Sequence, residues 1–103
     1  MTMEQNKKIA RFLNTEGKIT QLPQKQSVRL ALLSYLAQQF EENRFYTEQE
    51  VNALCEEWHT FGDYFLLRRE LIDQHFLSRK PDGSVYWKVI IKEVEPDSTV
   101  NLT

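Results

Sequence analysis

Apolar residues recur at helical spacing in four stretches of the chain. Between Gln24 and Glu41 they cover much of a helical wheel, which is typical of a helix at the centre of a small core. Residues 47–59 carry a narrower apolar stripe, and residues 64–74 carry apolar side chains on two flanks. Residues 4–13 are expected to form a short helix that stops before Gly17. The pattern therefore predicts four helices.

Local capping signals mark the starts of two of these helices. Thr47 has the position and chemistry of an N-cap, and Glu50, three residues later, completes a capping box. Tyr46 and Val51 stand at the two positions of a hydrophobic staple. Asp63 is a suitable N-cap for the next helix. We therefore expect helices that begin directly after Thr47 and Asp63.

Short strands are predicted around the last two helices. Residues 77–79 and 85–91 have strand character, and the segment KPDGS at residues 80–84 is typical of a tight turn. A further short strand is expected at residues 44–46. Helix, short strand, helix, turn, helix and hairpin is the order of a winged helix-turn-helix. We predict an α+β fold of this kind, with an extra N-terminal helix and a C-terminal two-stranded wing.

The composition fits one small soluble domain. The chain has 103 residues, of which 41% are hydrophobic, and we expect a single domain over residues 1–93 with a flexible tail at 94–103. No apolar run approaches the ~18 residues that a membrane span needs. The single cysteine, Cys55, cannot form an internal disulfide, which favours a reducing cytoplasm. The net charge of −2 argues against an indiscriminate nucleic-acid binder.

Side chains suited to catalysis or metal binding are scarce. Cys55 and His59 have the spacing of two metal ligands on a helix, but no second pair completes a site. Cys55 lies on the apolar stripe, where a small buried side chain is the expected role. No nucleophile, base and orienting acid can be picked out. We expect no enzyme, no cofactor and no metal.

The two adjacent arginines of the 64–74 helix are predicted to have different roles. On a helical wheel Arg68 falls in the middle of the buried arc, so we expect its guanidinium to pair with a carboxylate. Glu48 and Glu50 are the candidate partners. The wheel places Tyr64, Leu67 and Leu71 on one apolar flank, Phe65, Ile72 and Phe76 on the other, and Leu66, Arg69, Glu70, Asp73 and Gln74 outside.

Cationic residues are concentrated in this helix and the hairpin. Between Leu66 and Lys92 there are six cations and three anions, a net charge of +3, which leaves −5 for the rest of the chain. In a DNA-binding winged helix the third helix enters the major groove, where an exposed arginine contacts guanine or phosphate. The candidate DNA contacts, expected along one rim, are Arg69, Arg79, Lys80 and Lys88. The alternative interpretation is that these residues form a solvated face of mixed charge without a DNA contact. Lysines on an exposed strand would then discourage pairing with a strand of another molecule.

Several motifs resemble a known bacterial family. They include Gly17-Lys18-Ile19, YTEQEVN at residues 46–52, LRRELID at 67–73 and DGS-x-YW at 82–87. They are similar to the family called domain of unknown function 2087. The resemblance implies a winged-helix-like fold associated with transcription regulators, and it implies no activity. Where that family tends to have glycine, this chain has His75, so we expect a left-handed residue or a shifted helix end there.

Two functions are compatible with these observations. The first is duplex DNA binding by a transcription-regulator-like protein. In this hypothesis Arg69 reads a base or positions the protein on the duplex, and Arg79, Lys80 and Lys88 neutralise phosphates. A homodimer is then expected, built through the N-terminal segment or the 24–41 helix. The alternative is a protein-interaction module without DNA binding, which meets its partner through the acidic face of the 47–59 helix and an exposed Leu66.

Overall fold

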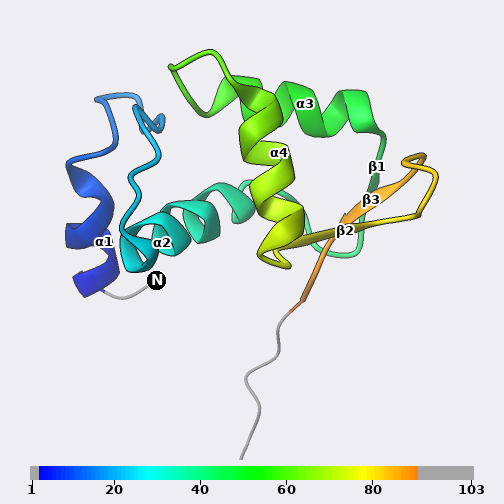
Figure 1. Ribbon diagram of the computed structural model, residues 1–103, viewed down its shortest axis with the longest axis horizontal. Coiled ribbons are helices and arrows are strands. Elements are labelled where there is room, and N and C mark those ends of the chain that lie inside the picture. The colour runs from blue at the N-terminus through cyan, green and yellow to red at the C-terminus, as the bar shows by residue number, and fades with distance from the viewer. Residues whose placement is uncertain (1–2, 91–103) are drawn as a thin grey trace, which may run out of the picture.

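The computed structural model describes residues 3–90, with side chains from residue 7 onward. The elements in this part of the chain are α1 (Met3–Ala10), α2 (Gln26–Ala37), β1 (Phe45–Tyr46), α3 (Glu48–Glu57), α4 (Tyr64–Asp73), β2 (Leu77–Arg79) and β3 (Tyr86–Lys88) (Figure 1). The strands form an antiparallel sheet in the order β1-β3-β2. The predicted tail at 94–103 and the end of the predicted second strand at Ile91 lie outside the described residues.

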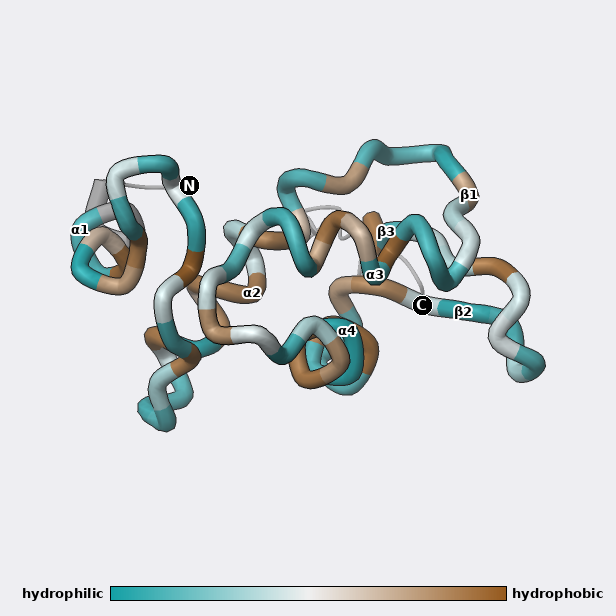
Figure 2. Tube along the Cα trace, turned by 90° about the horizontal axis from the view of Figure 1, so that it is seen from above, coloured by the Kyte–Doolittle hydropathy of each residue, from teal (hydrophilic) through white to brown (hydrophobic). Residues whose placement is uncertain are grey.

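α2 lies at the centre of the core, as its broad apolar surface predicted. Helices α1 and α4 both contact it, and α3 packs mainly against α4. Figure 1 shows α1 at one end of the molecule, the sheet at the other, and α2, α3 and α4 between them. In Figure 2, α4 is seen nearly end-on beside α3, and the hairpin of β2 and β3 extends past both helices. The buried residues of α2 are Val28, Ala31, Leu32, Leu33, Leu36 and Ala37.

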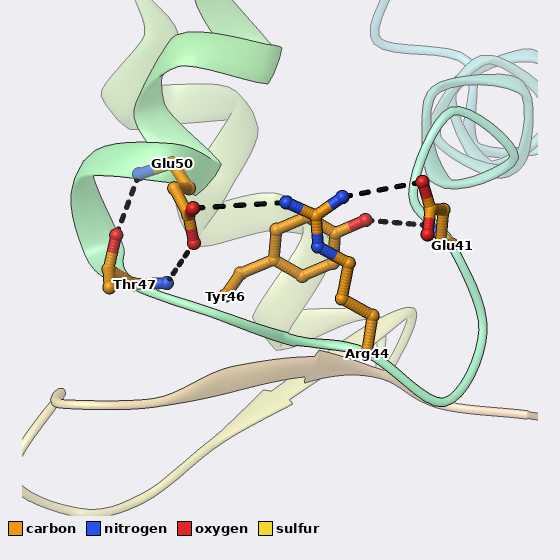
Figure 3. A network of polar contacts seen from close by, with 5 residues as sticks. All are labelled: Glu41, Arg44, Tyr46, Thr47 and Glu50. Atoms are coloured by element: carbon orange, nitrogen blue, oxygen red, sulfur yellow. Dashed lines mark hydrogen bonds and ion pairs between the residues drawn. The ribbon is translucent and has the colours of Figure 1, made fainter.

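The predicted caps of α3 and α4 are present. The Thr47 hydroxyl accepts a hydrogen bond from the Glu50 amide at 3.1 Å, and the Glu50 carboxylate accepts one from the Thr47 amide at 2.8 Å. Figure 3 shows this capping box and its continuation, in which Arg44 reaches Glu50 on one side and Glu41 on the other. Asp63 accepts a hydrogen bond from the Leu66 amide at 3.0 Å. Both helix starts are therefore fixed by contacts within three residues.

Several elements are shorter than the sequence predicted. α1 ends at Ala10 rather than residue 13, because tight turns follow it and Leu13 pairs with Ile19. α2 covers 26–37 rather than 24–41, because the amides of Gln39 and Phe40 bond to carbonyls only three residues back. β3 covers 86–88 of the predicted 85–91. No helix in the described part of the chain combines the length and apolar composition that a bilayer span requires.

The end of α4 carries the strained residue that the sequence predicted. His75 has φ 66°, in the left-handed region, and the amide of the next residue, Phe76, bonds to the Leu71 carbonyl at 2.8 Å. A side chain with a β-carbon costs roughly 1–2 kcal/mol in this conformation, whereas glycine adopts it freely. Glycine is also more flexible in the unfolded chain, which offsets part of the stability that a glycine at this position would add.

We expect His75→Gly to raise the free energy of unfolding by about 0.5–1 kcal/mol and the melting temperature by a few degrees. Thermal unfolding followed by circular dichroism measures the change. His75→Ala keeps the β-carbon, so it serves as the control and should show no such gain. A glycine variant that melts below the original chain would show that the His75 side chain stabilises the helix end.

Candidate functional site

Arg68 links α4 to α3 through its guanidinium group. Its side chain is only 15% exposed, and Nη1 lies 3.3 Å from Oε2 of Glu48. The same nitrogen donates a hydrogen bond to Oδ1 of Asn52 at 2.6 Å, and the guanidinium lies over the ring of Phe65 at 5.1 Å. Of the two expected carboxylate partners, Glu48 forms the pair, while Glu50 is occupied by the capping box and Arg44.

Arg69 points outward, as predicted, but its charge is partly balanced within the same helix. Its side chain is 67% exposed, and Nε lies 3.7 Å from Oδ2 of Asp73. The prediction that Glu70 also faces outward is wrong. Its carboxylate lies 3.3 Å from Nε of Arg29, and both side chains are largely buried. α2 covers this side of α4, which the helical wheel of α4 alone does not reveal.

The hairpin tip has the turn chemistry that its sequence predicted. Gly83 has φ 77°, the left-handed position expected of it. Asp82 accepts hydrogen bonds from the amide and the hydroxyl of Ser84 at 2.9 and 2.7 Å, and these bonds lower the pKa of its carboxyl group. Nη1 of Arg79 donates to the carbonyls of Lys80 and Pro81 at 3.4 and 3.3 Å. The tip is thus a well-bonded turn with Arg79 beside it.

A cleft between α4 and the hairpin brings Arg69 and Arg79 together. Its volume is about 430 Å³. Three arginines and three carboxylates line it, so its charges balance in number. We call it the α4–hairpin cleft; its lining residues are Glu48, Phe65, Arg68, Arg69, Ile72, Asp73, Arg79, Asp82, Gly83 and Tyr86.

The other two predicted DNA contacts line a different hollow. Lys80 and Lys88 border a depression of about 890 Å³ that shares no lining residue with the α4–hairpin cleft. Successive residues of a strand point to opposite faces, so Arg79 and Lys80 separate at the end of β2. Lys88 is half-buried, and its ammonium donates to the Phe40 carbonyl at 3.4 Å rather than standing in water. The expectation that all four cations share one rim is therefore wrong.

This second hollow carries exposed apolar side chains of the sheet, and we call it the outer sheet face. Phe45 is 73% exposed and stacks edge-on against Trp87, with ring centroids 6.1 Å apart. The sequence favours core positions for the tryptophans and phenylalanines, and for Phe45 this expectation is wrong, while Trp87 is only partly buried. The outward position of Phe45 follows from strand alternation, because its neighbour Tyr46 is buried. The lining residues are Asn43, Arg44, Phe45, Ser78, Lys80, Trp87, Lys88, Val89 and Ile90.

Two further expectations about exposure on α4 are wrong. Phe65, assigned to an apolar flank, is 53% exposed and forms a wall of the α4–hairpin cleft. Leu66, expected to be exposed, is only partly so. The two residues follow Asp63 within the first turn of α4, where neighbouring elements cover the helix unevenly.

The potential metal ligands Cys55 and His59 are both engaged in the core. Cys55 is fully buried, and this burial raises the pKa of its thiol to about 12, so the sulfur is uncharged at neutral pH. Nδ1 of His59 bonds to the Cys55 carbonyl at 2.6 Å, and Nε2 accepts the Asp63 amide at 2.8 Å. Both ring nitrogens are therefore used. Within residues 3–90 no group of three or more potential metal-ligating side chains occurs.

Comparison with known proteins identifies a family. A family model described as an uncharacterised protein conserved in bacteria matches residues 18–88. The matched range contains α2, α3, α4 and the whole sheet, and it leaves out α1. Comparisons with curated proteins and with solved structures found no match. Because the matched range is well over half of the chain, the protein belongs to the bacterial family called domain of unknown function 2087.

Proposed function

We propose that the chain is a winged helix-turn-helix that binds duplex DNA through α4 and the β2–β3 hairpin. The order of α2, β1, α3, α4 and hairpin, together with the sheet order β1-β3-β2, supports this assignment. α4 would be the helix that enters the major groove, and the hairpin would be the wing. The two elements are in direct contact where α4 meets β2, so they can act on one ligand.

The observation that carries the proposal is the placement of Arg69 and Arg79 on opposite walls of the α4–hairpin cleft. Both side chains of the ion pair between Arg69 and Asp73 are exposed, so the pair contributes at most about 1 kcal/mol to the stability of the fold. A phosphate can therefore take the place of Asp73 as the partner of Arg69. Arg79 bonds to carbonyl groups, which leave its full charge available. Lys80 adds a cation at the tip. Lys88 is left out, because its ammonium is held by Phe40.

The acidic residues around the cleft limit the affinity of one copy. Glu48 and Asp82 line the cleft together with Asp73, and the exposed face of α3 carries Glu56 and Glu57. Each copy then has two or three cations for phosphates. Two copies on one duplex would double that number, so a homodimer is part of this proposal.

Binding of a labelled random duplex, measured across a salt series, tests the proposed function. With two to three phosphate contacts per copy, the logarithm of the association constant should fall against the logarithm of salt with a slope of about −2 to −3. A homodimer would double that slope. A slope near zero, or no binding at low salt, would contradict the proposal.

A second candidate function is protein binding through the outer sheet face. Phe45 and Ile90 are 73% and 43% exposed there, and no carboxylate is among the lining residues. Of the three cations that line this face, Arg44 pairs with Glu41 and Glu50 and Lys88 bonds to the Phe40 carbonyl, so Lys80 supplies the unpaired charge among the described side chains. Solvent-exposed apolar patches of this kind are typical of interaction sites. The charge favours an acidic partner segment that also carries apolar side chains. Such a partner should protect Phe45 and Trp87 from solvent, and Phe45→Ser should abolish its binding while duplex binding persists.

A further inference from the structure

A cationic hollow lies at the opposite end of the molecule from the hairpin. Four cations line this hollow of about 460 Å³, which lies where the segment after α1 meets the start of α2. We call them the N-terminal cation cluster; they are Lys7, Lys8, Arg11 and Lys25. Phe12, Pro23 and Val28 are the apolar lining residues. The packing of α1 against α2 brings Lys25 to the other three.

Among the side chains that the structure describes, from residue 7 to 90, no carboxylate pairs with a cation of this cluster. No carboxylate is among the lining residues, and no ion pair between described side chains includes any of the four cations. Four of the other arginines, by contrast, are paired with a carboxylate: Arg29, Arg44, Arg68 and Arg69. The cluster therefore gathers four positive charges that have no ion pair with any side chain described between residues 7 and 90.

The charge distribution along the sequence agrees with the geometry. Residues 1–30 contain six cations and two anions, a net charge of +4, while the whole chain carries −2, so residues 31–103 carry −6. Like charges held together on an acidic protein destabilise the folded state and attract an anion from solution. The helix dipole places a partial positive charge at the start of α2, and no acidic residue in its first turn offsets this charge.

We propose that the N-terminal cation cluster binds phosphate groups of a nucleic-acid backbone. Its four cations are long and flexible, three of them lie near one another in the sequence, and all four are exposed. Such side chains follow a chain of phosphates better than they enclose a single small anion, for which no buried polar group is present in this hollow. The cluster shares no lining residue with the α4–hairpin cleft, and Figure 1 shows α1 and the hairpin at opposite ends of the molecule with α4 between them. A duplex that extends across α4 could contact both.

The test replaces all four cations with glutamine in the full chain and measures binding of the labelled duplex across the salt series. The variant is Lys7→Gln, Lys8→Gln, Arg11→Gln and Lys25→Gln. We expect its dissociation constant to rise about tenfold or more at low salt. Phosphate contacts of the cluster should steepen the slope by about 2–4 beyond the value expected from α4 and the hairpin alone, and the variant should lose this addition. The matched control exchanges each lysine for arginine and Arg11 for lysine. It keeps the charge, so binding should stay within about twofold of the original.

Further arms separate this proposal from the function assigned to α4 and the hairpin. If the glutamine variant binds the duplex as tightly as the original chain while the double variant Arg69→Gln and Arg79→Gln does not, the N-terminal cation cluster does not contact the duplex. Binding through the α4–hairpin cleft would still be supported. The reverse result would support phosphate binding by the N-terminal cation cluster and contradict duplex binding through the α4–hairpin cleft. Displacement of the duplex by inorganic phosphate at submillimolar concentration would show a free-anion site instead. Should the fourfold variant fail to fold, Lys25→Gln alone, at an exposed position, should still weaken binding about two- to threefold.

Discussion

Replacing Arg69 and Arg79 together with glutamine is expected to weaken duplex binding by about tenfold or more at low salt. The two guanidinium groups line the same cleft from α4 and from the hairpin, so they contribute phosphate contacts from both elements. Glutamine removes the charge but keeps a polar side chain of similar length. Because the pair between Arg69 and Asp73 is exposed and Arg79 bonds only to nearby carbonyls, the melting temperature should change little. Fluorescence anisotropy and thermal unfolding measure the two effects.

Lys88→Gln provides the matched control for this experiment. Its position in the sequence suggested a DNA contact, yet its ammonium is held at the Phe40 carbonyl and it does not line the α4–hairpin cleft. The substitution removes one charge that does not line the cleft, so affinity should stay within about twofold. Unchanged binding by the double arginine variant would contradict the cleft as a DNA surface. An equal loss of affinity in Lys88→Gln would show that binding depends on the total charge of the chain rather than on the cleft.

Arg68→Ala is expected to lower the free energy of unfolding by about 1–2 kcal/mol and the melting temperature by roughly 5–10 °C. The substitution removes the ion pair with Glu48 and the hydrogen bond to Asn52, and with them the link between α4 and α3. It also removes the aliphatic stem, which lies in a largely buried position. Glu48 is half-exposed and can be hydrated after the change, which keeps the loss below that of a fully buried pair.

Arg69→Ala, at the next position of the same helix, is the control for Arg68→Ala. Arg69 is mostly exposed and pairs only with Asp73, so its replacement should change stability by no more than about 0.5 kcal/mol. Two variants that melt at the same temperature would overturn the structural assignment of Arg68. A larger loss for Arg69→Ala would do so as well.

The parts of the fold that the sequence predicted depend on neighbouring residues. The caps of α3 and α4 involve partners three residues apart, so Thr47, Glu50 and Asp63 were identifiable from spacing alone. The left-handed conformation of His75 was one of two outcomes that the family resemblance implied, because the family tends to have glycine at this position. The wrong prediction for Glu70 involves Arg29, which is 41 residues away. A helical wheel cannot tell which polar position a distant helix will cover.

The candidate surfaces were less predictable, because they depend on which face of the sheet each side chain takes. Arg79 and Lys80 are adjacent in sequence, yet they line different hollows. The N-terminal cation cluster joins Lys25 to residues 7–11, which a reading of single helices does not connect. A charge sum over residues 1–30 would have indicated it, since that stretch is more positive than the hairpin region.

Mapping of the duplex-binding surface by nuclear magnetic resonance tests the central claim most directly. Backbone amide signals of the isotopically labelled chain would be followed as a short duplex is added. We expect the changes to concentrate in α4 around Arg69, in the hairpin from Arg79 to Gly83, and at the N-terminal cation cluster. Changes confined to Phe45 and Trp87 on the outer sheet face, or no changes at all at low salt, would contradict duplex binding through α4 and the hairpin.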